Sequence, residues 1–480
     1  MANNNDTLLM AHLMRRAGFG ASRIELDALV EQGYDETVDH IIDAKPEIPV
    51  SDYMIRRYQP DHGSLMGSTT NGSNWLYRMI WSDVAFQEKI ALFWHGIFAT
   101  GYSKLANGKV LHDQIKMFAK HGLGSFENLL VEISRDPAMI VWLDNCESHK
   151  GAINENYGRE LLELFSMGTG NYTEQDIKEA SRAFTGWTIA NTEYMTLKSQ
   201  RDSIWPYGRL SFHFEYDPDD HDDGEKTFLG RTGKFNGEDI VKIICEQKAT
   251  ANFISRHMYS FFVADEPPVP EWPYKEPNDS AAIDALSSVY FDSGFDIKEM
   301  LRFLFKSEFF KSEKVWNKRV KSPVELVAGA LRLTKEFDRP SREEYFTCLR
   351  TSYMGQWLMH PPSVEGWHWG TEWLDSGTLV ERVNFSSSSL GNLKSAGVKN
   401  IAENIRKSIK APFKPEQVID LALDQLGALI VSDNTRSNLV EYAESNFKSI
   451  DDDSKIADIS NEDVGEVLKL VGAMPEFQRA

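Results

Sequence analysis

Residues 75–101, WLYRMIWSDVAFQEKIALFWHGIFATG, form a long run in which apolar residues return every three or four positions. This spacing places the apolar side chains on one face of a helix, which must then pack against other helices. The same spacing recurs along much of the chain, at 108–122, 125–136, 154–168, 238–263, 281–294, 297–310, 322–337, 415–429 and 461–477. The sequence therefore predicts a mostly α, multi-helical globular protein.

Polar residues mark where some of these helices begin and end. Ser22 with Glu25, and Thr173 with Asp176, have the spacing of residues that cap a helix N-terminus. Gly33 is placed to end the first of these helices, because glycine tolerates the backbone conformation of a C-cap. We therefore expect helices to start after residues 22 and 173.

One stretch breaks the helical pattern. In SFHFEYDPDDHDDGEKTFLG, residues 211–230, every second residue from Phe212 to Tyr216 is apolar, which is the period of a β-strand. KTFLG then returns after Asp223–Gly224, a pair typical of turns. We expect one small β-hairpin over about residues 209–230, with an elaborated turn.

Composition changes indicate loops and a domain boundary. HGSLMGSTTNGSN, residues 62–74, is rich in glycine, serine, threonine and asparagine and predicts a loop, and prolines around residue 270 predict a rigid connection. A serine run begins near residue 386, after which aromatic residues become sparse. We therefore place a main helical domain at 1–385 and a C-terminal helical segment, packed on it, at 386–480.

The bulk composition limits the classes of partner. The chain has 480 residues, 41% hydrophobic residues, a formal charge of −20 and a pI near 5.1. Such an acidic protein is not expected to bind nucleic acid or an anionic membrane surface, since both require basic patches. No apolar run approaches the ~20 residues of a membrane span. The three cysteines lie far apart and form no zinc-ribbon spacing or disulfide framework.

The first residues, MANNNDTLLMAHLMRRAGFG, place polar and acidic residues before the arginines, the reverse of a secretory signal peptide. We expect a cytoplasmic protein from the chain as written. An exported protein that has been trimmed of its signal would look the same.

The acidic stretch is a candidate metal site. It carries seven carboxylates and two histidines between Ser211 and Gly230. An EF-hand register fails because Gly230 stands where a bidentate glutamate is needed. A looser Ca²⁺ or Mg²⁺ site, or a histidine–carboxylate site for Mn²⁺ or Zn²⁺, stays open. We take Asp217 and His221 as candidate metal ligands; the alternative is an exposed acidic turn whose charges are solvated.

His213 and His95 are further candidates. His213 lies on the strand face opposite the apolar residues, so it is either surface or the floor of a cleft. We take it as a candidate catalytic proton carrier. His95, in FWHGIF, is a third candidate metal ligand, although a histidine in an apolar helix is more often a hydrogen-bonded core residue.

The helix predicted at 154–168 carries two candidate catalytic residues. Glu160 lies at the edge of the apolar stripe, where a carboxylate needs an arginine or a metal as partner. Arg159 is four residues from both Glu155 and Glu163, so it is a structural ion-pair partner or an anion clamp. Candidate substrate-binding residues are Asn156, Trp187 and Trp367; tryptophans form platforms for sugars and other flat ligands but also fill cores.

Seven motifs occur in an order that resembles a known family: HLMRRAGFGAS, FWHGIFAT, NENYGRELLELFSMGTGNYTEQDIKEASRAFTGW, FHFEYDPDDHDDGEKTFLG, SPVELV, MGQWLMHPPSVEGW and MPEFQ. The chain resembles the bacterial domain-of-unknown-function 1800 family from about Leu8 to Gln478. The resemblance implies a helical protein. It also implies a partner from a sulfatase-like family of unknown function numbered 1501, beside which many members are encoded, and many members carry export signals. Two positions depart from the family: Ile97 and Phe165 stand where relatives have histidines, so a metal site in relatives would have fewer ligands here.

Two functions stay open. The first is an enzyme, hydrolase-like or metal-assisted, whose polar cleft is formed by the Asn154–Glu163 helix, the 211–226 hairpin loop and the His95 segment. The second is a non-catalytic helical binding or scaffold protein that partners the sulfatase-like protein. In the second case the polar residues would be buried networks that fix helix packing.

Overall fold

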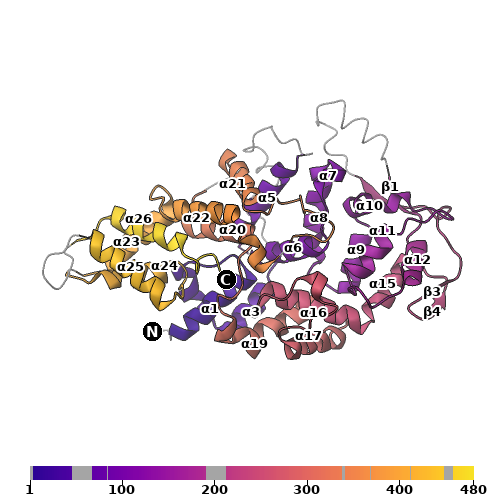
Figure 1. Ribbon diagram of the computed structural model, residues 1–480, viewed down its shortest axis with the longest axis horizontal. Helices are drawn as coiled ribbons and strands as arrows, with labels where there is room; N and C mark the ends of the chain where they lie inside the picture. The colour runs from indigo at the N-terminus through magenta and orange to yellow at the C-terminus, as the bar shows by residue number, and fades with distance from the viewer. Residues whose placement is uncertain are drawn as a thin grey trace.

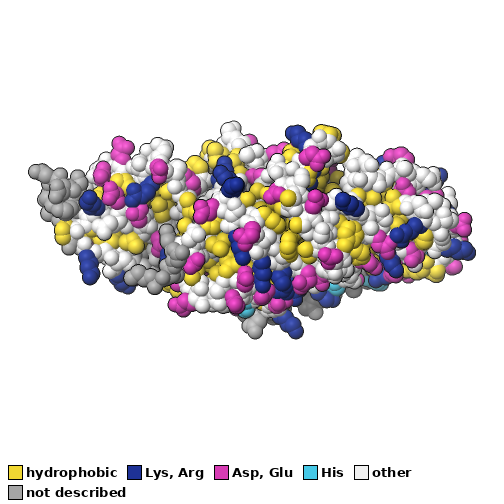
Figure 2. Space-filling model, turned by 90° about the horizontal axis from the view of Figure 1, so that it is seen from below, with side chains coloured by type: hydrophobic (Ala, Val, Ile, Leu, Met, Phe, Trp, Pro, Cys, Tyr) yellow, Lys and Arg dark blue, Asp and Glu magenta, His cyan; other side chains and the backbone are white. Residues whose placement is uncertain are grey.

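The structure is a computed structural model that describes residues 4–45, 67–83, 85–190, 212–337, 341–367, 369–410, 412–447 and 458–480. The molecule is an elongated assembly of helices, with the C-terminal helices at one end and the two small sheets at the other (Figure 1). The predicted mostly α fold is confirmed. On the face shown in Figure 2, acidic and basic side chains are interspersed along the length of the molecule.

The N-terminal third builds the centre of the molecule. Its helices are α1 (Asn4–Ala17), α2 (Arg23–Gln32), α3 (Tyr34–Asp43), α5 (Ser68–Trp81), α6 (Ala85–Ile97), α7 (Tyr102–Leu105), α8 (Gly108–His121), α9 (Phe126–Ser134), α10 (Pro137–Trp142) and η1 (Asn145–Glu147). α6 is buried on almost every side, with only Gln87 partly exposed. The run that decides the fold therefore becomes a central helix around which the others pack.

Residues 68–74, predicted as loop, form the first turns of α5, so that prediction was wrong; residues 62–66 lie outside the described residues. Every residue from Ser68 to Ile80 is buried. The small side chains allow neighbouring segments to approach closely: a Cβ on Gly72 would lie 3.2 Å from Cys348 Sγ. Tertiary packing here outweighs a low intrinsic helix propensity.

The sheet end follows α11 (Asn156–Glu163) and α12 (Glu174–Ala183), and its strands are β1 (Trp187–Ala190), β2 (His213–Tyr216), β3 (Lys226–Phe228) and β4 (Arg231–Gly233). β2 pairs antiparallel with β1, and β3 pairs with β4. The expected pairing of residues 210–216 with 226–230 was therefore wrong, although a small hairpin exists; residues 209–211 lie outside the described residues. The Leu229–Gly230 turn, in which both residues have positive φ, closes the β3–β4 hairpin.

The middle of the chain supplies α15 (Gly237–Cys245), α16 (Lys248–Phe262), η2 (Val269–Glu271), α17 (Ser280–Asp292), α18 (Ile297–Lys306), α19 (Glu308–Lys311), η3 (Glu313–Val315) and α20 (Pro323–Thr334). α16 packs against α17 and carries side chains toward α6, where Phe93 contacts Phe261 and Phe262 at ring distances of 5.2 and 5.6 Å. These contacts fix α16 beside the central helix.

The last elements are α21 (Arg342–Tyr353), η4 (Gly370–Trp373), α22 (Ser376–Leu390), α23 (Ala396–Ser408), α24 (Pro415–Gln425), α25 (Asp433–Asn446) and α26 (Asn461–Ala473). α22 packs against both α20 and α26. The predicted boundary between residues 385 and 386 therefore falls inside a helix that joins the two parts. Within the described ranges, no helix is long and apolar enough to cross a membrane.

The predicted helix starts are confirmed. Ser22 and Glu25 form a capping box at the start of α2, and Thr173 and Asp176 form one at the start of α12. Each pair satisfies backbone N–H groups that the first turn of a helix leaves without partners. The α12 cap also fixes the position of α12 against α11, which carries the candidate site residues.

Candidate functional site

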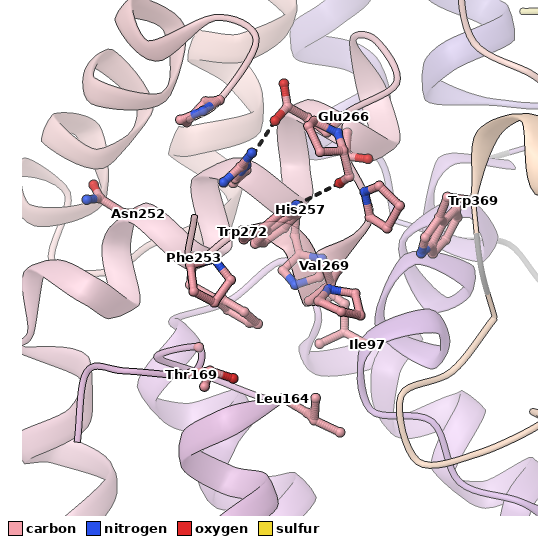
Figure 3. A pocket seen from close by; sticks show the side chains of 18 of the residues that line it. Ile97, Leu164, Thr169, Asn252, Phe253, His257, Glu266, Val269, Trp272 and Trp369 are labelled. Atoms are coloured by element: carbon pink, nitrogen blue, oxygen red, sulfur yellow. Dashed lines mark hydrogen bonds and ion pairs between the residues drawn. The ribbon is translucent and has the colours of Figure 1, made fainter. Parts of the chain in front are cut away.

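A cavity of about 630 Å³ opens between six parts of the chain. Its walls come from α6, from residues 163–171 at the C-terminal end of α11, from α16, from the proline-rich segment 266–277, from the start of α17, and from the loop 365–372. Figure 3 shows His257 and Trp272 between Phe253 on one side and Trp369 on the other, with Leu164 and Thr169 across from them. Such a volume holds a ligand the size of a small oligosaccharide or a drug.

Aromatic rings pack against one another in the α16 wall. The His257 ring lies 4.5 Å from the Phe253 ring and 4.6 Å from the Trp272 ring. The Trp272 Nε1–H donates to the Pro267 carbonyl at 2.8 Å, which fixes the ring on the proline-rich segment (Figure 3). The wall is therefore pre-formed and rigid.

A buried ion pair locks the proline-rich segment onto α16. Arg256 Nε donates to Glu266 Oε2 at 2.8 Å, and the Glu266 side chain is 0% exposed (Figure 3). Arg256 Nη1 donates to the Lys275 carbonyl at 3.0 Å, and its guanidinium lies 4.6 Å from the centre of the Trp272 ring. Since breaking a buried pair leaves an uncompensated charge, this lock is essential to the cavity wall.

His257 is neutral over the physiological range. Burial, with the charge of Arg256 as a smaller cause, lowers the pKa of His257 to about 3. Its Nε2 is buried and has no hydrogen-bond partner in the described part of the chain. The neutral imidazole is therefore part of the aromatic wall of the cavity, and its Nε2 is free to bond a ligand.

Three carboxyl groups gather at the α11 side of the cavity. Glu163 and Glu365 line it, and Glu160 lies one helical turn before Glu163. Burial raises the pKa of Glu160 to about 7, with the charges of Glu163 and Glu365 adding to the rise and Arg159 opposing it. Tyr172 Oη donates to Glu163 Oε2 at 2.9 Å, which orients Glu163 as an acceptor. A carboxyl group whose pKa is raised toward neutral pH thus lies close to two other carboxyl groups, an arrangement that proton-transfer chemistry uses.

Two predicted residues lie at the α6 side of the cavity. Trp367 lines the cavity, and its ring packs 5.0 Å from that of His95. His95 is 0% exposed, lies 5.4 Å from the Trp75 ring and does not line the cavity, whereas its neighbours Gly96 and Ile97 do. Burial lowers the pKa of His95 to about 3. The structure gives His95 the environment of a core histidine.

Of the residues predicted on α11, neither Glu160 nor Arg159 nor Asn156 is itself part of the described cavity lining, which begins at Glu163. Arg159 donates to Glu174 Oε1 at 3.1 Å and Oε2 at 2.7 Å, and Glu155 lies 3.8 Å away. This forked bond raises the pKa of Arg159 and ties α11 to the first turn of α12. Asn156 is exposed at the start of α11. Neither residue lines the cavity among the described residues.

The 212–226 loop contributes nothing to the described lining of the cavity, so the three predicted segments do not converge on one cleft. Some of its acidic residues have basic partners: Asp222 accepts from Arg182 Nε at 2.7 Å, and Asp220 lies 2.6 Å from His149 Nδ1. The loop is therefore an ordered turn in which carboxylates are paired with basic side chains, rather than a group of carboxylates that repel one another. Charge repulsion predicted from sequence is relieved by cations from α12 and from residue 149.

The remaining candidates in that loop lie apart from the cavity as well. His213 is exposed on β2, and Asp217 is exposed with its side chain accepting from the Asp219 N–H at 3.0 Å. His221 Nδ1 lies 2.9 Å from the Thr185 carbonyl and is therefore its hydrogen-bond donor. Trp187 is buried against Phe184 at a ring distance of 5.1 Å. Within the described residues, no group of three or more His, Cys, Asp or Glu side chains is arranged to hold a metal ion.

Sequence reasoning did not find the α16 wall. Its aromatic residues lie inside an amphipathic helix, where they match any core pattern, and the prolines near 270 predicted a connection. A Pro-rich segment with Trp272 and Tyr274 at its centre was the available signal, since prolines fix an exposed aromatic segment without secondary structure.

A model of the family described as "Protein of unknown function (DUF1800)" matches residues 12–479. The chain belongs to the DUF1800 family. A search of curated proteins and a search of solved structures found no match. In this DUF1800 protein Ile97 lines the cavity, whereas Phe165 is fully buried with its ring 5.4 Å from that of Phe98. Of the two positions that the resemblance singled out, Ile97 therefore lies at the cavity and Phe165 lies in the core.

Proposed function

We propose that this DUF1800 protein is a hydrolase that binds a polar ring-containing molecule, such as an oligosaccharide, in the 630 Å³ cavity. The main support for the proposal is that one cavity has aromatic rings in its walls and, at one edge, the carboxyl groups of Glu163 and Glu365 with Glu160 next to them. Aromatic rings stack on the apolar faces of sugars, and paired carboxyl groups of different pKa perform their hydrolysis.

In the proposed reaction, one carboxyl group acts as general acid and another as general base. Glu160, with a pKa of about 7, donates its proton to the leaving oxygen as general acid. Glu163 or Glu365 acts as the general base and removes a proton from the water that attacks the carbon of the broken bond. The water's hydroxyl joins that carbon, and the leaving oxygen keeps the proton from Glu160, so both charges balance.

The charge of the lining narrows the class of ligand. Six carboxylates line the cavity, at Glu163, Glu266, Glu276, Asp284, Glu365 and Glu372. Arg256 is the one arginine or lysine in the described lining, and Glu266 already pairs with it. Such a lining repels acidic ligands and accepts neutral or cationic ones. A sulfated or otherwise acidic polymer is therefore disfavoured as the direct substrate.

A metal-assisted version uses the same residues. The side-chain oxygens of Glu163 and Glu365 would contribute two ligands to Ca²⁺, Mg²⁺, Mn²⁺ or Zn²⁺, and the substrate would have to complete the coordination shell. This version requires added cation to raise the activity, and EDTA to remove that gain.

The second candidate is a binding protein that partners a sulfatase-like protein of the 1501 family. α21 favours it, because Phe346 and Tyr353 stand two turns apart with 45% and 59% of their surface exposed. Exposed aromatic side chains are enriched where proteins meet. This candidate predicts binding of a partner that does not depend on Glu160.

Substitutions at the cavity distinguish the two candidates. In oligosaccharide hydrolysis assays, Glu160→Gln is expected to reduce kcat by about 10²–10⁴-fold with KM little changed, because it removes the acid but keeps the shape. Activity of the wild-type protein should fall as pH rises through about 7, as Glu160 loses its proton. Trp272→Ala should weaken binding instead. Glu276→Gln, an exposed lining carboxylate on another wall, serves as the matched control.

Thermal midpoints supply the second readout. Glu160→Gln is expected to keep or raise the midpoint, since it removes a carboxyl that burial disfavours in its ionised form. A large fall in stability with no change in hydrolysis or ligand binding would instead favour the scaffold function.

A further inference from the structure

Behind the cavity lies a cluster of buried basic side chains from four distant parts of the chain. They come from α1, α6, the segment before α20, and α22: Arg15, Arg16, Lys89, Arg319, Lys321 and Arg382. Five of the six are buried, with Arg16, Lys89 and Arg382 at 0% exposure; Lys321 is partly buried. The Arg319 guanidinium lies 4.8 Å from the centre of the Phe261 ring, and Phe261 lines the cavity.

Glu325 is the acid at the centre of this cluster, and it is already saturated. It accepts two bonds from Arg319 Nη1, at 2.8 and 2.9 Å, and one from the Ser322 N–H at 2.7 Å. Lys89 Nζ also bonds Glu325 Oε1. Its two oxygens therefore accept four hydrogen bonds from three donor groups, and they leave no room for further cations.

Asp265 is the other side-chain carboxylate that acts on the cluster. Its charge acts on Arg16, and the charges of Arg319 and Arg16 act on it in return. Among the described residues, no ion pair within 4.0 Å joins Asp265 to either arginine. Six basic side chains thus face two side-chain carboxylates, so basic side chains outnumber acidic ones in this part of the described interior.

The arginines leave N–H groups without partners. Within the described residues the atoms Arg15 Nε and Nη2, Arg16 Nε and Nη1, Arg319 Nη2, and Arg382 Nη1 are buried and make no hydrogen bond. The bonds that these arginines do make outside Glu325 go to neutral groups, such as Arg15 Nη1 to the Gly427 carbonyl and Arg16 Nη2 to the Val263 carbonyl, both at 2.9 Å. Carbonyl dipoles satisfy some donors but do not cancel the charge.

Burying this many unpaired positive charges is costly in free energy. An unpaired buried charge is among the most costly groups a fold can contain, and arginine does not lose its proton to escape that cost. Lysine can: burial, with Arg15 as the next cause, lowers the pKa of Lys321 to about 7. Even when Lys321 is neutral, the buried arginines outnumber the two carboxylates. A further negative group is therefore needed to balance their charge.

We propose that the cluster binds one small oxyanion, of the inorganic phosphate or sulfate type. The unpartnered N–H groups of Arg15, Nε and Nη2, lie along one edge of its guanidinium, which is the geometry that grips two oxygens of an oxyanion. Arg16, Arg319 and Arg382 each offer at least one further donor. The anion joins α1, α22 and the segment before α20, and so stabilises the back wall of the cavity. This site is independent of the proposed hydrolysis.

The test uses the full-length protein. After exhaustive dialysis into phosphate- and sulfate-free buffer, the protein is unfolded in acid, and the released anion is measured by ion chromatography. In parallel, thermal midpoints are recorded in sodium phosphate, sodium sulfate and sodium chloride at equal ionic strength. We expect either about one oxyanion released per chain, or a saturable rise of the midpoint by a few degrees in phosphate or sulfate that chloride does not reproduce.

Two variants assign the effect to the cluster. Arg15→Gln is expected to abolish the oxyanion-specific rise. Arg332→Gln is the control, because Arg332 is a partly buried arginine whose Nη1 bonds the Met79, Ile80 and Ser82 carbonyls outside the cluster, and it should keep the rise. The proposal is overturned if no oxyanion is released and the three salts give the same midpoints, or if Arg15→Gln responds to phosphate as the wild type does. Should Arg15→Gln not fold, the wild-type release and salt measurements decide alone.

Discussion

At the scale of single residues, burial sets the behaviour of several carboxyl groups, and Glu344 is the sharpest case. Its side chain is 0% exposed; Oε2 accepts from the Ser341 N–H at 3.3 Å, while Oε1 has no partner within the described residues. Burial raises the pKa of Glu344 to about 8. The folded protein therefore favours the neutral form.

Glu344→Gln tests this directly. In an unfolded chain the group ionises near pH ~4.3. As pH rises from there toward 8, the unfolded wild type is stabilised by ionisation and the folded state is not, so the wild type loses up to ~1.4 kcal/mol of stability per pH unit. The variant has no such loss. Urea unfolding at pH 4 and pH 8 should show a difference between variant and wild type that grows with pH.

The neighbouring exposed carboxyl supplies the control for this prediction. Glu343→Gln, at an exposed position of the same turn, should show no growth of the difference between pH 4 and pH 8. An equal response of the two variants would mean that Glu344 is ionised in the folded protein at neutral pH.

At the scale of elements, the contact of α11 with α12 positions the candidate acid. A Cβ on Gly158 would lie 2.2 Å from Ser181 Oγ and 3.0 Å from the Ile177 carbonyl oxygen. Glycine is therefore needed here for close approach rather than for its backbone freedom. Because α11 carries Glu160 and ends at Glu163, the spacing of the two helices sets where these carboxyl groups lie.

Gly158→Ala is expected to destabilise the protein by ~1–3 kcal/mol through overpacking, although alanine is the better helix former. Ser181→Ala in the same chain removes the nearest atom and should restore part of the loss, measured by chemical denaturation. If hydrolysis is detected, kcat should fall with Gly158→Ala and recover in part in the double variant. A single variant as stable as the wild type would show that the helices separate without cost.

At the scale of the whole molecule, the larger of two hydrophobic clusters in the described residues includes residues from Met10 to Phe477. The C-terminal helices share it: α22 packs on α20 and α26, and Arg382 Nε donates to Gln478 Oε1 at 3.1 Å. Because the helices before and after residue 385 contribute to the same core, we expect them to unfold together. The segments 1–385 and 386–480 are therefore expected to depend on each other.

Calorimetry and truncation test that dependence. The full chain should give one unfolding transition, coincident by circular dichroism and tryptophan fluorescence. A chain ended at residue 385 lacks part of α22 and all of α26, so it should show no cooperative transition. Two separate transitions in the full chain, or a cooperative transition in the shortened one, would contradict the single core.

The sequence by itself determined the local features of this protein. The helical class and the caps at Ser22 and Thr173 were predictable, because each depends on the spacing of a few neighbouring residues. The partner of β2, the helical state of residues 68–74 and the wall formed by α16 were not. They depend on contacts between residues far apart in the chain, which local spacing does not encode.

Only the tertiary structure decided the chemistry of the candidate residues. The sequence offered Glu160 and Arg159 as candidate catalytic residues and His95 as a candidate metal ligand, each with a structural alternative. In the fold Arg159 bonds Glu174, His95 packs against two tryptophans, and Glu160 lies near two other carboxyl groups. The physical reason is that charge and protonation depend on burial and on neighbours within a few ångströms, and most of those neighbours come from other elements.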